Sequence, residues 1–137
     1  MLFGRLFQMA DLNQKLNDLN NTKDVTDQMD EKDIQDNKVM AILAYLSWLV
    51  LIPLFAAKDS KFARFHCNQG LVLAICEIVV CVVLSILTAI PILGILFSIL
   101  LFLASILFLV FAVLGIINAV NGRAKELPLI GSFKLLK

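Results

Sequence analysis

Residues 70–120 read GLVLAICEIVVCVVLSILTAIPILGILFSILLFLASILFLVFAVLGIINAV and contain one charged residue, Glu77. A second apolar stretch, from Val39 to Ala57, contains no charged residue. Uncharged apolar stretches of about 18 or more residues are typical of helices that cross a membrane. The two stretches therefore predict a helical integral membrane protein.

The composition of the whole chain agrees with this prediction. The chain has 137 residues, of which 60% are hydrophobic and 17% charged, whereas a soluble domain averages about 45–50% apolar and about 25% charged residues. A net charge of +1 gives no electrostatic reason to expect nucleic-acid binding. The three cysteines, Cys67, Cys76 and Cys81, are odd in number and lack metal-ligand spacing. We therefore expect buried thiols, with no disulfide framework, metal site or cofactor.

Three apolar runs predict an all-α, polytopic membrane bundle with about three spanning helices, over residues 39–57, 70–90 and 94–120. The first run has 19 residues, or roughly 29 Å as a helix, which matches a hydrocarbon core of about 30 Å. Pro91 and Gly94 separate the second run from the third. Ser60 is expected to cap a helix that continues into the second span. Asn121-Gly122 should end the third span, because Gly accepts the left-handed C-cap conformation.

Residues 1–37 are predicted to lie outside the membrane domain, which covers residues 38–137 and ends in a short basic tail. Apolar residues at helical spacing predict an amphipathic helix over residues 2–19. This helix either lies on the membrane surface or docks on its own protein or frays. Residues 20–30 are polar and acidic, which is typical of a flexible linker. Asp30 and Asp33 are then placed to cap the next helix.

The distribution of Lys and Arg predicts the orientation, because cytoplasmic loops are enriched in these residues. The first loop contains three basic residues, Lys58, Lys61 and Arg64. The C-terminal tail contains four, Arg123, Lys125, Lys134 and Lys137, whereas residues 88–93 contain none. We therefore expect a multi-pass protein of the cell membrane whose first loop and C-terminal tail are cytoplasmic. Three spans would place the N-terminal segment outside. A four-span arrangement would put the basic loop outside and fits the counts less well.

Glu77 is the one charged residue inside the predicted spans. Insertion scales give about 2.5–3.5 kcal/mol for an ionised carboxylate at the centre of a spanning helix, so we expect Glu77 to face inward and to be partly protonated. One interpretation is a polar path or groove lined by His66, Gln69 and Glu77. The other is that Glu77 lies near enough to the interface to snorkel, or to hydrogen-bond Tyr45, Ser47 or Asn118.

Small residues recur along one face of the third predicted span, at Ser98, Ser105, Ala112, Gly115 and Ala119. Small side chains let helix backbones approach closely in lipid. These positions therefore predict a helix-packing face, which serves either within one chain or between chains.

Two segments of the chain resemble a known family. They are residues 38–71, KVMAILAYLSWLVLIPLFAAKDSKFARFHCNQGL, and residues 116–131, IINAVNGRAKELPLIG, with the core motif F-x-R-F-H-x-x-Q-G at Phe62 to Gly70. The resemblance is to small bacterial membrane proteins grouped with the twenty-kilodalton component of the chloroplast inner-envelope import translocon, the Tic20-like proteins. It covers residues 38–137 and implies a self-associating helical bundle. The chloroplast members have four spans, compared with the three predicted here, and take part in protein translocation.

The sequence contains no paired carboxylates, no polar Ser, His and Asp set and no Gly-rich phosphate loop, which favours a protein that is not an enzyme. We expect a structural or interaction component of a membrane assembly. Its surroundings would be the lipid bilayer, and its partner either a second copy or another membrane protein. The alternative is a channel- or translocon-like component with a polar path near Glu77. A soluble helical bundle is a third, remote interpretation.

Overall fold

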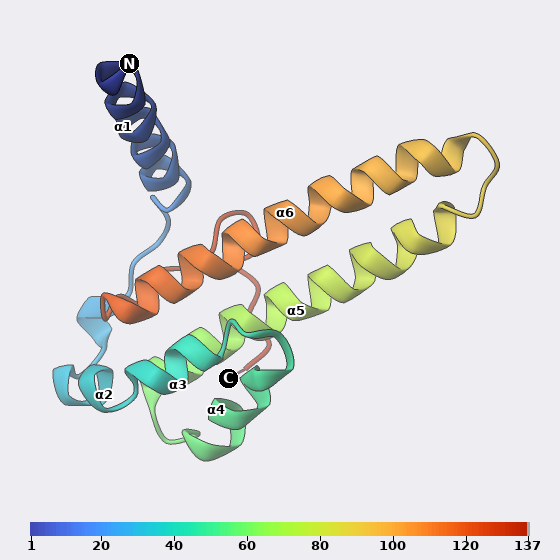
Figure 1. Cartoon of the computed structure of the whole chain (residues 1–137). Coiled ribbons are helices and arrows are strands. Elements are labelled where there is room, and N and C mark those ends of the chain that lie inside the picture. Colours follow the sequence, from blue (N-terminus) through green and yellow to red (C-terminus); the bar gives the residue numbers. More distant parts are fainter. Residues whose placement is uncertain (137) are drawn as a thin grey trace.

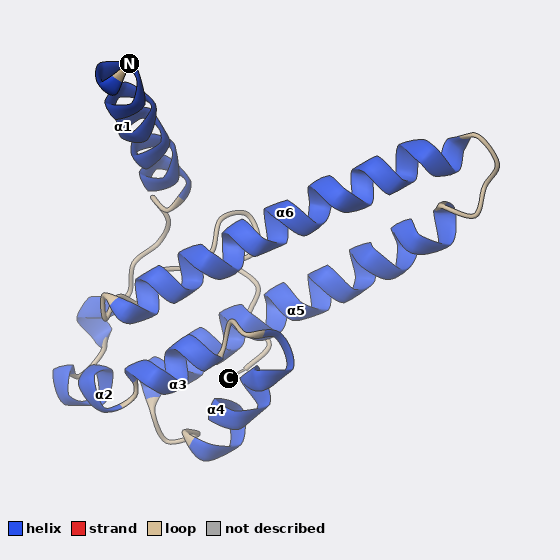
Figure 2. Cartoon of the chain, in the orientation of Figure 1, coloured by secondary structure: helices blue, strands red, loops and turns tan. Residues whose placement is uncertain are grey.

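A long antiparallel hairpin of two helices dominates the computed structural model, which describes residues 1–136 (Figure 1). Helix α5 (Lys61–Leu87) and helix α6 (Leu93–Val120) form the hairpin. Around its open end lie α2 (Glu31–Asp36), α3 (Lys38–Leu43), α4 (Leu51–Ala56) and the 3-10 helices η1 (Thr26–Gln28) and η2 (Ser47–Val50). Helix α1 (Leu2–Leu19) projects away from this body. Figure 2 shows only helices and loops, so the predicted all-α class is confirmed for the described residues.

Local sequence signals explain where the two long helices begin and end. The Ser60 hydroxyl accepts a hydrogen bond from the Ala63 N–H at 3.0 Å, so Ser60 caps the start of α5 as predicted. Pro91 follows α5, in the loop that leads to α6. Beyond α6, Gly122 adopts φ +69°, a conformation that costs a glycine little. At 1.5 Å per residue each helix is about 40 Å long, which exceeds the thickness of a hydrocarbon core.

The first predicted span, residues 39–57, is not one helix. It is broken into α3, η2 and α4, and each α-helical piece has six residues, or about 9 Å. Ser47 at the break has φ 58°, a left-handed conformation that interrupts an α-helix. Three spanning helices are therefore not confirmed. Two helices of the described chain, α5 and α6, are long and apolar enough to cross a membrane.

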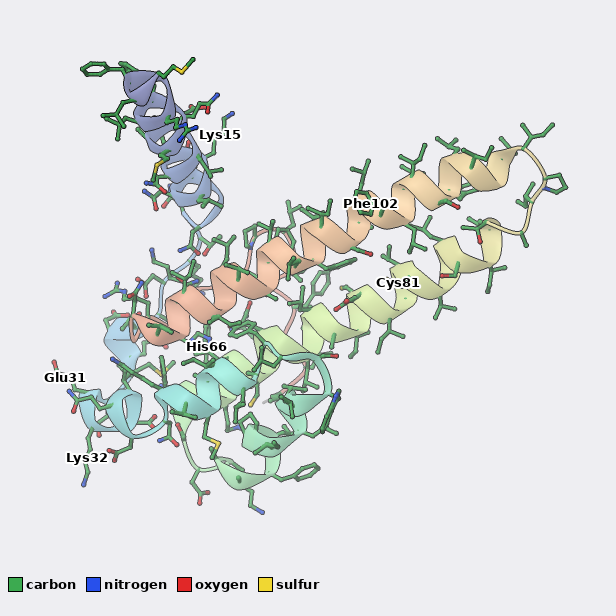
Figure 3. All side chains as sticks on the ribbon, viewed as in Figure 1. Lys15, Glu31, Lys32, His66, Cys81 and Phe102 are labelled. Carbon is green, nitrogen blue, oxygen red and sulfur yellow. The ribbon has the colours of Figure 1, made fainter. Side chains whose placement is uncertain are left out.

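The buried core lies at the open end of the hairpin. One cluster centres on residues from the α3–η2 connection, α5 and α6, and includes Tyr45, Cys67, Leu73, Phe111 and Leu114. A second cluster contains Ile34, Ala41, Phe62, Ala119 and Ala124. Beyond these clusters the hairpin exposes large apolar side chains, such as Ile78, Ile86 and the labelled Phe102 (Figure 3). Soluble proteins rarely expose apolar surface on this scale, so this part of the hairpin is suited to contact lipid.

The N-terminal segment is fastened to the same end of the molecule as the C-terminal tail. The Asn20 and Asn118 side-chain amides exchange two hydrogen bonds, of 2.8 and 2.9 Å. Asp24 and Lys125 form an isolated antiparallel bridge. The structure therefore does not show the expected separation of the N-terminal segment from the tail by three spans, because the two segments meet at the base of the hairpin.

Candidate functional site

The motif Phe62–Gly70 contains three of the buried polar side chains of the described chain, and these form a polar site. Phe62, His66, Asn68 and Gln69 are all buried, and they lie on the first turns of α5. Figure 3 labels His66 where α3, α5 and the end of α6 come together. We call His66, Asn68, Gln69 and Tyr45 the clamp, because their side chains fasten other segments to α5.

His66 joins two segments that are far apart in the sequence. Its Nδ1 lies 2.6 Å from the Tyr45 hydroxyl and its Nε2 lies 3.0 Å from the Arg123 carbonyl oxygen. A carbonyl oxygen can only accept, so Nε2 carries the hydrogen and Nδ1 accepts from Tyr45. The rings of Phe62 and Phe65 meet His66 edge-on, with centroids 4.8 and 5.3 Å away. His66 is therefore a neutral imidazole fixed in one tautomer.

Tyr45, two residues beyond the end of α3, donates the hydrogen bond to the His66 ring. Burial, with a smaller contribution from Cys67, raises the pKa of the Tyr45 phenol above its ordinary value of 10.0. The phenol therefore stays protonated and can donate to His66. Its ring lies over Gly115 of α6, where an added Cβ would come within 2.2 Å of the ring. A small residue at position 115 is thus required for this contact within the chain.

Asn68 and Gln69 bind the backbone of the C-terminal tail. Gln69 accepts from the Leu127 N–H at 2.8 Å and donates to the Gly131 carbonyl at 2.9 Å. Asn68 donates to the Phe133 carbonyl at 2.9 Å and accepts from the N–H groups of the two residues that follow Lys134. Side-chain amides are suited to this because each carries both a donor and an acceptor.

Residues 24–26 of the N-terminal linker also bind the segment that follows α6. The Val25 N–H donates to the Ala124 carbonyl at 2.9 Å, and the Ala124 N–H donates to the Thr26 hydroxyl at 2.8 Å. Asp24 accepts from Thr26 and forms an ion pair with Arg123. Burial acts to raise the pKa of Asp24, but the hydrogen bonds from Thr26 and Arg123 and the charge of Arg123 outweigh it and lower the pKa below 3.8.

Asp33, which the sequence pattern placed at the start of α2, contacts the start of α5 instead. Asp33 accepts from the Phe62 N–H at 3.0 Å and from the Ser60 hydroxyl, and so caps α5. It was expected to support the start of its own helix, α2, together with Asp30. Asp30 does occupy the N-cap of α2, but without a side-chain hydrogen bond. No pattern in the sequence points to this contact, because Asp33 and Phe62 lie 29 positions apart.

Glu77 lies in a different place from the clamp. It is half-buried and lines a cleft of about 500 Å³ between α5, α6 and the turn that carries Tyr45 and Ser47. Ser105, on α6, lines the same cleft. The structure thus brings His66 and Gln69 together in the clamp and places Glu77 beside a separate opening. Among the described residues, Glu77 forms no hydrogen bond with Tyr45, Ser47 or Asn118, the three partners that the sequence offered.

The small residues of α6 lie in three different environments. Gly115 and Ala119 are buried against the α3 side of the chain. Ser98 and Ser105 are exposed, and each hydroxyl bonds the carbonyl four residues earlier, at 2.8 and 2.9 Å. Ala112 is half-buried and lines the cleft beside Glu77.

Sequence reasoning did not single out Asn68, Arg123 or Asn20 as members of a site. Asn68 lies inside the motif, and a buried Asn next to a buried Gln is a signal that could have been used, because buried amides require partners. Arg123 accepts a hydrogen bond from His66 through its backbone carbonyl. Every residue type has this group, so the identity of residue 123 cannot reveal the contact. In the part of the chain that the structure describes, no three His, Cys, Asp or Glu side chains are grouped as metal ligands.

The comparison with protein families gives one match. Residues 36–134 match the model of MamF/MmsF, the magnetosome magnetite crystal formation protein family. Comparison with curated proteins and with solved structures gave no significant match.

The match overturns the resemblance to the Tic20-like family, which rested on almost the same range, residues 38–137. The motif Phe62–Gly70 that carried the resemblance encodes the clamp, which specifies how α5 is fastened to the tail. Such a packing motif defines how helices are held and says little about activity. Since the matched range covers most of the chain, including α3 to α6 and the clamp, the chain belongs to the magnetosome magnetite crystal formation protein family, MamF/MmsF.

Proposed function

We propose that this chain is a non-enzymatic membrane component that takes part in forming magnetite crystals. The observation that carries the proposal is the family match over residues 36–134, which includes both long apolar helices. The family description names magnetite crystal formation. Helices α5 and α6 suit a protein that acts from a membrane.

The clamp supports a structural role. His66, Asn68 and Gln69 each use both ends of their polar side chains on hydrogen bonds within the chain. Within the described residues, every buried side-chain nitrogen and oxygen has a hydrogen-bond partner. Catalytic groups must instead present a free donor, acceptor or nucleophile to a substrate. The polar groups of the clamp stabilise the fold and are not arranged to react.

The distribution of charge supports one orientation. All 12 Lys and Arg residues lie outside residues 65–122, and a two-span hairpin puts the N-terminal segment and the tail at the same end. The excess of basic residues at this end favours the cytoplasmic side of the membrane. The opposite end would then be the short loop between α5 and α6.

In this orientation, only the loop between α5 and α6 would face the side of the membrane opposite the cytoplasm, so only this loop could contact a crystal on that side. The loop between α5 and α6, residues 88–92, contains no charged side chain. Iron ions are bound in proteins by carboxylate, imidazole or thiolate groups, and this loop has none of them. We therefore infer that the protein acts through contacts in the membrane, with lipid, with a second copy or with another membrane protein.

A channel in a single copy is not supported by the geometry. Two helices that pack against each other enclose no aqueous path between them, and the cleft beside Glu77 is lined by residues of both helices and of the turn that carries Tyr45. A pore would need several copies arranged around it.

The proposal can be tested in a magnetite-forming bacterium that lacks its own member of this family. Expression of this chain is expected to shift crystal size toward that of the parent strain, measured by electron microscopy. The protein should be found in the magnetosome membrane fraction by immunoblot. Unchanged crystals in cells whose magnetosome membranes contain the protein would argue against a part in crystal formation.

The variant Glu77→Gln separates a structural role from charge-dependent chemistry. It keeps the shape and hydrogen-bonding capacity of the side chain and removes its negative charge. We expect the variant to shift crystal size as far as the unmodified chain does. A lost effect at unchanged membrane levels would instead indicate that the carboxylate itself takes part in a reaction or in transport.

A further inference from the structure

A second cleft, separate from the one beside Glu77, lies between the start of α5, the N-terminal linker and the C-terminal tail. Its volume is about 630 Å³, within the usual range of ligand sites. Four basic side chains line it, Lys23, Lys61, Arg64 and Lys134. Two acidic side chains, Asp59 and Glu126, also line it, so the lining contains more basic than acidic side chains.

We propose that this cleft, the basic cleft, binds the phosphate-bearing headgroup of an anionic phospholipid. The inference is independent of any part in crystal formation, because it rests on the charge of the cleft and on its position relative to the hairpin.

The lysines of the basic cleft are not consumed by ion pairs. In the described part of the chain, the ammonium groups of Lys23, Lys61 and Lys134 have no carboxylate within 4.0 Å, and the two ion pairs that are formed involve other residues. Lys61 makes one long hydrogen bond, of 3.4 Å, to the Gln28 carbonyl. Lysine ammonium groups carry three donors each, so they retain the capacity to bind a phosphate.

The basic cleft lies along α5 just outside the depth of the lipid headgroups, within reach of long basic side chains. The apolar part of α5 begins at Gly70, and Arg64 and Lys61 precede it by six and nine residues. At 1.5 Å per residue these positions lie roughly 9 and 14 Å outside the apolar segment. The headgroup region extends about 5–8 Å beyond the hydrocarbon core, and long basic side chains can reach toward it.

The lining of the basic cleft favours a lipid over a free phosphate ion. Phe65, Met29 and Leu136 contribute apolar surface beside the basic groups. A phospholipid carries a negative phosphate next to glycerol and acyl carbon atoms, so it can satisfy both kinds of surface. A small hydrated anion would leave the apolar part of the cleft unused. Juxtamembrane Lys and Arg groups are also the residues that recognise anionic lipids.

The test uses the purified full-length chain in a neutral detergent, with lipid binding measured by native mass spectrometry. The lipids are phosphatidylglycerol and phosphatidylcholine at matched concentration. The variant K61Q/K134Q removes two charges from the basic cleft. The control variant K32Q/K58Q removes two charges from the same end of the molecule, at exposed positions that do not line the cleft. Figure 3 shows Lys32 pointing away from the body of the protein.

We expect the unmodified chain and K32Q/K58Q to bind phosphatidylglycerol in preference to phosphatidylcholine. The affinity of K61Q/K134Q for phosphatidylglycerol should fall on the order of tenfold, since each basic residue near an anionic surface contributes appreciably to binding. Equal loss in both variants would overturn the proposal, because binding would then follow net charge and not the cleft. Absence of any preference for phosphatidylglycerol in the unmodified chain would overturn it as well.

A further arm distinguishes a lipid from a free phosphate. Glycerol 3-phosphate and inorganic phosphate are added in excess over phosphatidylglycerol. Retained lipid binding supports the proposal. Displacement of the lipid by either small anion at comparable concentration would identify a soluble phosphate compound as the ligand and would contradict the choice of a lipid.

Discussion

His66 illustrates how the role of a single side chain depends on its partners. In the sequence it is a candidate for a polar path, because it precedes Glu77 on the same predicted helix. In the structure its two ring nitrogens are engaged by the Tyr45 hydroxyl and the Arg123 carbonyl. A histidine with both nitrogens engaged and three aromatic neighbours is held in one tautomer and cannot readily exchange a proton.

Asp24 gives a prediction about pH at the same scale. Its folded-state pKa is lowered, so its carboxylate stabilises the fold fully above the ordinary pKa of 3.8, and this stabilisation is lost as the pH falls through the lower folded value. Asp24→Asn should lower the free energy of unfolding by on the order of 1 kcal/mol at neutral pH. The difference from the unmodified chain should shrink in acid. Denaturant unfolding in detergent micelles, followed by circular dichroism, measures both values.

Asp27→Asn is the matched control for that experiment. Asp27 lies three residues further along the same linker, is exposed and forms no ion pair within the described residues. Its substitution should change stability little at either pH. If Asp24→Asn and Asp27→Asn behave alike, the contact between Asp24 and Arg123 does not hold the linker to the tail.

At the scale of the helices, the connection between α3 and α5 depends on a close backbone approach. A Cβ added at Gly70 would lie 1.9 Å from the Ala44 carbonyl oxygen, which is backbone and cannot rotate away. Gly70→Ala should therefore push α3 off α5, at a cost of about 1–3 kcal/mol in the free energy of unfolding. Thermal unfolding in detergent should show a lower midpoint for this variant.

Gly4→Ala provides the matched control, because nothing lies within 4 Å of the added methyl group. Alanine is preferred over glycine inside a helix by about 1 kcal/mol, so this change alone should leave stability unchanged or raise it. A midpoint for Gly70→Ala at or above that of the unmodified chain would contradict the close approach of α3.

For the whole molecule, the two-span hairpin predicts which segments share a side of the membrane. Single cysteines at Asn21, Ala89 and Ser132 occupy exposed positions in the linker, the hairpin loop and the tail. The background has alanine at the three native cysteines. A membrane-impermeant thiol reagent applied to intact cells that carry the chain in their cytoplasmic membrane should label Ala89→Cys and leave the other two variants unlabelled until the cells are lysed.

The same experiment distinguishes two spans from three. Three spans would place Asn21 and Ser132 on opposite sides, so exactly one of these two positions would be labelled in intact cells. Labelling of both positions, with Ala89→Cys protected, would keep the two-span hairpin and reverse the proposed orientation. Whether Asn21 and Ser132 behave alike therefore tests the number of spans, and the outcome for Ser132 tests the direction of insertion.

Much of the fold could be predicted from local sequence. The two long helices follow from apolar residues in uninterrupted runs, and their ends follow from Ser60 and from Asn121-Gly122. The membrane class follows from the same runs, because hydropathy summed over one helix needs no knowledge of the rest of the chain. The motif Phe62–Gly70 was visible in the sequence and lies where the clamp is built, although the family assigned from it was wrong.

Whether residues 39–57 form one spanning helix depended on the tertiary structure. By hydropathy and length this segment resembles a span, yet it folds into short pieces. Its middle packs where Gly70 and Gly115 leave room for Ala44 and for the Tyr45 ring, and Tyr45 also bonds His66. The capping of α5 by Asp33 and the binding of the tail by Gln69 are equally remote in sequence. Periodicity and hydropathy report on neighbours along one helix, whereas these contacts join residues 20 to 60 positions apart, and only the packed chain brings them within bonding distance.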